Sequence, residues 1–192
     1  MKTLLVSAAF AAAILAPSAA SAQSIPASVI AVVDVNRVSN ECNACKTAVA
    51  SLRSQAEAEQ NREKALVTPL ETEQQSIRAA ISALNGKQPD AALQARMKAF
   101  QTKYQQAQDE ANRGQEQLQR NAAYVNQQIQ QKLNTVYTPV MQRRGANLLL
   151  DLAATVASTP AVDVTNDVLA ALNAALPSIS TTAPVKQQPQ GR

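Results

Sequence analysis

Cys42 and Cys45 are the only cysteines of the chain, and their Cys-x-x-Cys spacing makes them the first candidates for chemistry. This spacing occurs in haem attachment, zinc binding, thiol–disulfide exchange and local disulfides. Haem attachment requires a histidine directly after the second cysteine, but Lys46 follows here and the chain contains no histidine. A structural zinc site requires four ligands, and no further Cys or His exists to complete one.

Two main interpretations of the cysteine pair stay open, a redox-active dithiol and a local disulfide. The cysteines could also form intermolecular bonds or be inert. A dithiol near a helix start can have a lowered thiol pKa, although redox motifs of this kind follow a strand in a βαβ unit, which this sequence lacks. A local disulfide would close a small loop and act as a structural clasp. An oxidising compartment favours the disulfide. Cys42 and Cys45 are therefore the candidate disulfide, at the root of the helical segment that follows.

The N-terminal residues predict the compartment. Lys2 gives a positive start, residues 4–15 form an apolar run too short for a stable membrane span, and residues 20–22 (Ala-Ser-Ala) match a cleavage site. We therefore expect a signal peptide over residues 1–22 and export to the periplasm. A membrane anchor is the alternative, disfavoured because the flanking residues are small rather than basic or aromatic. Export also argues against nucleic acid as a partner.

Composition argues against an enzyme. The 192 residues include no His, no Trp, two Phe, three Tyr and four Gly, which is poor material for a sandwich, a barrel or a deep pocket. With no phosphate-binding loop and no carboxylate pair that a rigid pocket could hold, we expect neither catalysis nor a cofactor. The net charge of +4 and the pI near 9.3 suit an acidic unfolded chain or an anionic lipid headgroup as partner.

A helical hairpin is predicted over residues 46–142. Apolar residues follow three- and four-residue steps up to Leu84, and a heptad pattern continues after a turn at 85–89. These patterns predict two antiparallel helices, a coiled-coil arm about 60–75 Å long with its tip at 85–89. Residues 68–71 (Thr-Pro-Leu-Glu) match a capping box, so the first helix is expected to break or kink there. Pro139 is expected to bend the second helix.

The two ends of the chain predict short strands. Residues 29–35 are apolar and β-branched, residues 147–152 form a second strand candidate, and residues 153–158 a third. Gly145 is expected to cap the arm, and Thr165 to cap a last helix. The resulting fold class is α+β, with strands that can pair only if the chain ends meet.

The domain organisation follows from these elements. Residues 23–45 and 143–176 make up a β-rich body, and the Pro-, Ser-, Thr- and Gln-rich residues 177–192 are expected to be a disordered tail. A body of about 60 residues has a thin core, which predicts that the body oligomerises.

In this order, the stretches resemble a known family. Residues 30–35 (Ile-Ala-Val-Val-Asp-Val), the charged helical middle, residues 145–151 and residues 163–169 are similar to the Skp/OmpH family of periplasmic chaperones for outer membrane proteins. The resemblance implies a homotrimer with a β-barrel core, from which helical hairpins surround a cavity. It implies an ATP-independent holdase that binds unfolded outer-membrane proteins there and prevents aggregation. A lipopolysaccharide site has been proposed for the family, but no motif places it here. The cysteine pair and Pro69 depart from the family pattern.

Charge is distributed unevenly along the arm. Five basic residues and one acidic residue lie from Arg78 to Lys103, whereas five acidic and two basic residues lie from Ser54 to Glu73. A positive distal part would attract acidic clients in a salt-dependent manner, although solvated helices often carry such charges. Apolar residues near the tip would contact clients if the helices splay, although most seam positions serve to zip the hairpin. The candidate client-binding residues are Arg78, Lys87, Arg96, Met97, Lys98, Phe100, Lys103 and Tyr104.

Two other functions stay open. A passive coiled-coil tether or scaffold in the cell envelope would bind a folded partner and show no preference for unfolded clients. A thiol oxidoreductase would depend on Cys42 and Cys45, and replacing both with serine would abolish its activity.

Overall fold

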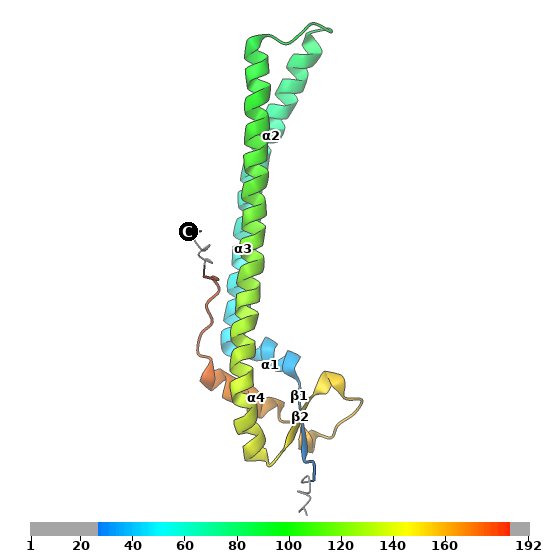
Figure 1. Cartoon of the computed structure of the whole chain (residues 1–192), viewed down its shortest axis with the longest axis vertical. Helices are drawn as coiled ribbons and strands as arrows, with labels where there is room; N and C mark the ends of the chain where they lie inside the picture. The colour runs from blue at the N-terminus through cyan, green and yellow to red at the C-terminus, as the bar shows by residue number, and fades with distance from the viewer. Residues whose placement is uncertain (1–26, 185–192) are drawn as a thin grey trace, which may run out of the picture.

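The computed structural model describes residues 27–184 and consists of a long two-helix arm on a small body (Figure 1). The chain is mostly helical over these residues, with one two-stranded sheet, as the expected α+β class requires. The predicted signal peptide and the last eight residues of the predicted tail, 185–192, lie outside the described residues. None of the helices in the described part combines the length and the apolar content that a membrane span requires.

The arm consists of helices α2 (Asn43–Ala83) and α3 (Ala91–Arg144), which run antiparallel. Asn85 and Gly86 reverse the chain between them, with φ angles of 48° and 85°. Asn and Gly adopt this left-handed region more readily than other residues. Gly145 ends α3 in the same region, with φ 67°, so its expected role as a helix cap is confirmed.

Helix α2 runs through Pro69 without a break, so the predicted break is wrong, and the alternative of a kink stays a prediction. A proline inside a helix costs one backbone hydrogen bond and crowds the preceding turn, but its φ angle is compatible with the helix. Long helical segments on both sides offset this cost, because a helix is propagated far more easily than it is nucleated. Residues 68–71 therefore lie inside α2. Helix α3 likewise continues through Pro139.

The two chain ends meet in a parallel sheet. β1 (Ile30–Val33) pairs with β2 (Leu148–Asp151), with Ile30 opposite Leu148 and Val33 opposite Asp151. The third strand expected at residues 153–158 is not formed. Instead, the Asp151 carboxylate accepts the N–H of Ala153 at 3.1 Å and starts a 3-10 turn, Leu152–Ala154. Such local bonds to aspartate compete with strand pairing. A second 3-10 turn, Pro160–Val162, follows.

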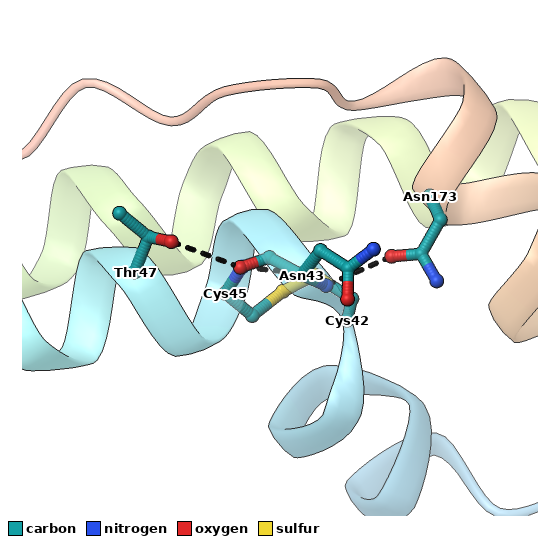
Figure 2. The surroundings of a disulfide bond; sticks show 5 residues. All are labelled: Cys42, Asn43, Cys45, Thr47 and Asn173. Carbon is teal, nitrogen blue, oxygen red and sulfur yellow. Dashed lines mark hydrogen bonds between the residues drawn. A yellow bond between two sulfur atoms is a disulfide. The ribbon is translucent and has the colours of Figure 1, made fainter.

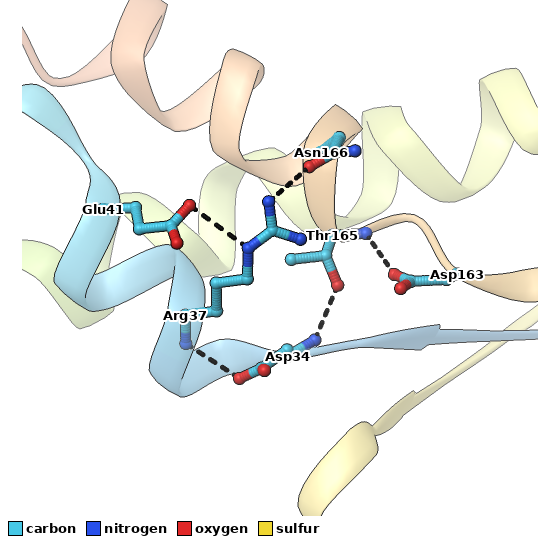
Figure 3. Close-up of polar contacts among 6 residues, drawn as sticks. All are labelled: Asp34, Arg37, Glu41, Asp163, Thr165 and Asn166. Carbon is cyan, nitrogen blue, oxygen red and sulfur yellow. Dashed lines mark hydrogen bonds and ion pairs between the residues drawn. The ribbon is translucent and has the colours of Figure 1, made fainter. Parts of the chain in front are cut away.

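Polar contacts tie the start of the chain to its last helix (Figure 3). The sequence predicts Thr165 as the cap of α4 (Thr165–Ala175), but its hydroxyl accepts the backbone N–H of Asp34 at 2.9 Å instead. Asp163 accepts the backbone N–H of Thr165 at 2.8 Å. The Thr165 hydroxyl and then its N–H lower the pKa of Asp163, partial burial opposes them, and Arg37 adds to the lowering.

Arg37 extends this cluster to the first helix. The residue lies in α1 (Val35–Glu41), and Asp34 caps this helix by accepting the Arg37 N–H at 2.8 Å. The Arg37 guanidinium donates to Glu41 at 3.2 Å and to Asn166 of α4 at 3.0 Å (Figure 3). Side chains from both chain ends thereby hold α1 against α4.

The core lies where the body meets the root of the arm. α1, α4 and the first turns of α2 pack there against the last turns of α3, and the most deeply buried side chains come from all four helices. The side chains with no exposed surface are Val38, Cys42, Leu133, Val140, Val168 and Leu172.

Residues 177–184 form an extended segment that climbs along the arm after α4 (Figure 1), and we call it the strap. The Ser180 N–H donates to the Gln128 side chain at 3.1 Å, and the Gln128 side chain donates back to the Ser180 carbonyl at 2.8 Å. Thr181 accepts from Gln55 through its carbonyl and its hydroxyl, both at 3.2 Å. The expectation of a disordered tail is therefore wrong for residues 177–184.

Candidate functional site

The structure joins Cys42 and Cys45 as a disulfide, with Cα atoms 5.1 Å apart (Figure 2). Cys42 has an extended conformation between α1 and α2, and its sulfur accepts the N–H of Cys45 at 3.1 Å. The neighbouring Asn43 N–H donates to the side chain of Asn173 in α4 at 2.8 Å. The pair therefore lies at the corner where the chain leaves the body and enters the arm.

Burial favours one of the two interpretations of this pair. Cys42 is 0% exposed and Cys45 is 1% exposed. Redox-active cysteines need at least partial access for the partner thiol, whereas structural cysteines are buried. The geometry favours a clasp over a redox centre. Within residues 27–184 there is also no group of three or more His, Cys, Asp or Glu side chains that could hold a metal ion.

The arm divides into two halves at the level of Glu59 and Gly114. The root half comprises residues 43–58 and 115–144, and the distal half residues 59–83 and 91–114. A side chain at position 114 would meet the Glu59 carboxylate, which would have to shift away, so the carboxylate packs directly against Gly114. One oxygen of that carboxylate, Oε1, is buried without a hydrogen-bond partner.

The root half has a closed seam. Its buried apolar side chains on α3 recur at three- and four-residue steps, as the heptad pattern predicts. They are Val125, Ile129, Leu133, Val136 and Val140.

Asn121 forms a polar layer at the end of this seam that faces the tip of the arm, and it is only 4% exposed. Its amide donates to Gln55 at 2.7 Å, and its carbonyl accepts from Gln117 at 2.7 Å and from the Ala183 N–H of the strap at 2.9 Å. Such a satisfied buried network fixes the register of the two helices.

The distal half is open. Of its residues, only Ile77 and Ala107 are buried. A groove of about 400 Å³ lies between the two helices, and we call it the distal groove. Its apolar wall on α2 surrounds Pro69, and its wall on α3 carries two aromatic rings, whose centroids are 6.1 Å apart. These apolar lining residues are Leu66, Val67, Leu70, Phe100, Tyr104, Ala107 and Ala111.

The sequence-predicted apolar residues lie at or near this groove. Phe100 and Tyr104 line it, with Tyr104 46% exposed. Met97 is 37% exposed and lies one turn nearer the tip. Leu66 and Leu70 belong to the apolar pattern predicted for the first helix, and sequence reasoning missed them as groove residues. The signal that could have found them is Pro69, which weakens the helix between them.

The predicted basic residues divide into two groups. Arg96 is engaged within the arm: its guanidinium donates to both carboxylate oxygens of Glu73, at 2.6 and 2.9 Å, and to Ser76 at 2.7 Å. The hydrogen bond from Arg96 lowers the pKa of Glu73, and the same bond raises the pKa of Arg96. The other four are exposed and form no ion pair within residues 27–184. They are Arg78, Lys87, Lys98 and Lys103.

A long antiparallel helical arm rooted in a small sheet made by both chain ends defines a class of arm-bearing α+β proteins. The chain belongs to the OmpH-like family, because the family described as "Outer membrane protein (OmpH-like)" matches residues 29–172. A crystal structure of a candidate outer membrane chaperone (OmpH-like) from Caulobacter crescentus has the same fold, with a TM-score of 0.70 and 21% sequence identity. The match covers 86% of this chain and 96% of that one. None of the curated proteins matches the sequence significantly.

Membership of this family supports a chaperone role in general. It also confirms the family resemblance inferred from the sequence.

Proposed function

We propose that this protein is a periplasmic holdase, which binds unfolded outer-membrane proteins between its arms without ATP and keeps them from aggregating. The observation that carries the proposal is the open distal half of the arm in a chain of this family. Partly exposed apolar side chains stand beside exposed cations there. A surface of this kind binds non-native chains weakly at many points, as a holdase must.

The proposed assembly is a homotrimer whose sheets join in a β-barrel core. Support comes from the sheet, because a two-stranded sheet is marginal alone and the outer edge of β2 can pair with another chain, whereas the outer edge of β1 already contacts Asp163 and Val164. Four large apolar side chains of this region are 37–50% exposed: Val29, Ile30, Leu148 and Leu150. Burying them against two other copies would remove this apolar surface from water. Light scattering of the mature protein tests the proposal, and a monomeric mass would contradict it.

The exposed cations of the distal half would attract acidic stretches of a client. Arg78, Lys87, Lys98 and Lys103 form a positive region near the tip, and three arms would place three such regions around one cavity. Attraction of this kind acts over about 10 Å at 0.1 M salt and weakens as salt rises. The acidic residues in the middle of α2 would repel acidic stretches of the client and so keep these stretches near the tip.

The test of the holdase is suppression of aggregation. An outer-membrane β-barrel protein unfolded in urea is diluted into buffer with the purified protein, and turbidity is followed. We expect suppression near one trimer per client, stronger at low salt than at high salt. Arg78→Gln with Lys98→Gln and Lys103→Gln should weaken it. The matched control, Arg113→Gln with Lys132→Gln and Arg143→Gln, changes three exposed cations outside the tip region.

Absence of suppression by the unaltered protein at low salt would contradict the holdase. The passive tether predicts the opposite result in a pull-down, because a tether would retain a folded partner and would not bind unfolded clients.

A further inference from the structure

The rim of the distal groove carries an uneven distribution of charge. Two charged residues line the groove, Glu63 and Glu71, and both are exposed carboxylates of α2. Neither forms an ion pair within residues 27–184, whereas Glu59 and Glu110, one turn or so towards the root, both contact Arg62. The α3 wall adds only uncharged residues. The groove therefore presents an apolar floor between two carboxylates that are free to accept a cation.

The spacing of the two carboxylates fits an extended chain. Glu63 and Glu71 are eight residues apart, which is about 12 Å along a helix. Four residues of an extended strand span about 13 Å, and residues i−2, i and i+2 point to the same side. A strand whose central residue enters the groove would thus bring the side chains two residues before and two after it to the carboxylates.

The size of the groove limits what can enter. A volume of about 400 Å³ is at the lower end of the range for small-molecule sites, so it admits one or two large side chains and no folded domain. The stacked rings of Phe100 and Tyr104 offer an aromatic wall, and aromatic pairs favour a further ring over an aliphatic group of similar size. A phenylalanine or tyrosine side chain is the best occupant.

We infer that the distal groove of each arm binds an extended client segment in which an aromatic residue is flanked, two residues away on each side, by lysine or arginine. This inference rests on the proposed function and names a class of segment that the holdase selects. The exposed cations of the tip attract acidic stretches, while the groove takes basic stretches with an aromatic anchor. A single unfolded chain can satisfy both at different points of its sequence.

Binding of labelled peptides to the full mature protein tests this inference. The probe is a fluorescein-labelled peptide Ser-Lys-Ser-Phe-Ser-Lys-Ser, and two controls replace both lysines with glutamate or the phenylalanine with alanine. We expect fluorescence anisotropy at low salt to show about tenfold tighter binding of the probe than of the alanine control, because a buried phenylalanine side chain is lost. The glutamate control should also bind more weakly, and the difference should shrink at high salt.

Variants of the protein locate the site. Glu63→Gln with Glu71→Gln should weaken probe binding by about threefold to tenfold. Glu57→Gln with Glu116→Gln is the matched control, because both carboxylates are exposed on the arm but outside the groove, and it should leave binding unchanged. Leu70→Ser should weaken binding of the probe, whereas Val49→Ser, at a residue 60% exposed in the root half, should not. Circular dichroism checks that each variant keeps its helices.

Two outcomes overturn the inference: equal binding of the three peptides, or probe binding that Glu63→Gln with Glu71→Gln leaves unchanged. Either result can occur while the unaltered protein still suppresses aggregation, and then only the groove specificity fails. Failure of the holdase itself would appear separately, as aggregation that proceeds in the presence of the unaltered protein whatever the peptides do.

Discussion

The root half and the distal half of the arm have similar apolar periodicity and different packing. The root half is closed because a third layer, formed by α4 and the strap, covers the two helices. The distal half has only α2 and α3, and two helices alone enclose almost no interior. The comparison teaches that a heptad pattern selects which residues face the partner helix, while a third element decides whether those residues are buried.

Core truncation is the strongest way to test this comparison. Leu133→Ala in the root half removes a side chain with no exposed surface, and should lower the free energy of unfolding by about 2–5 kcal/mol. Leu70→Ala in the distal half removes a half-buried side chain at an open groove, and should cost about 1 kcal/mol or less. Urea unfolding followed by circular dichroism measures both. Equal losses would show that the distal half is packed as tightly as the root.

Breaking the disulfide should have the second largest effect on stability, again at the root half. Cys42→Ala with Cys45→Ala removes a link that closes a four-residue loop, and the loss of unfolding free energy should be about 2 kcal/mol. Reduction of the unaltered protein should have a similar effect, and reductant should not change the variant further. Thiol titration of the unfolded, non-reduced protein is the control. Two free thiols there would mean that the clasp is not formed in solution.

Removing the strap tests its part in the third layer. A chain that ends at Leu176 loses the hydrogen bonds to Gln55, Asn121 and Gln128, and should be less stable by about 1–2 kcal/mol. Hydrogen exchange should become faster in the root half and remain the same in the distal half. A chain that ends at Pro184 keeps these bonds and serves as the matched control. If hydrogen exchange in the chain that ends at Leu176 is unchanged, the strap does not contribute to the closed packing of the root half.

Acid should produce the smallest effect, through Asp163 in the body on which the root half rests. The pKa of Asp163 is lowered by Thr165, so its carboxylate contributes stability above the ordinary carboxyl pKa of about 3.9. That contribution is lost as the pH falls through the lower, folded-state pKa. Asp163→Asn should therefore be less stable than the unaltered protein at neutral pH, with a difference that narrows below about pH 4. Thermal unfolding at several pH values measures it, and a constant difference would exclude Asp163 as the cause.

Local patterns predicted the elements well. The glycine after two arginines ends α3, the Asn-Gly pair reverses the chain, and apolar runs at both ends form the sheet. Each of these signals acts within a few residues or within one helical period. The same local logic predicted a break or a kink at Pro69, and the break was wrong, because the stability of the surrounding helix outweighed one proline.

Contacts between distant residues were the part that sequence could not give. The strap is held by side chains that precede it by 52 to 130 positions, and its composition alone is typical of disorder. Thr165 was a reasonable cap by position, yet its hydroxyl accepts a hydrogen bond from the backbone N–H of Asp34, 131 residues earlier. The distal groove likewise depends on how α2 and α3 lie together, and periodicity carries no information about that separation.

The parallel pairing of β1 with β2 has a consequence for the order of folding. Val29 donates its N–H to the side chain of Asn147 across 118 residues, and β1 pairs with β2, so the first strand has no partner until the whole arm has been synthesised. Closing such a loop costs entropy, which a preformed hairpin reduces by bringing its two ends together. We therefore expect the two helices of the arm to pair first and the body to fold last. The apolar first strand of the nascent chain would then stay exposed for part of its synthesis.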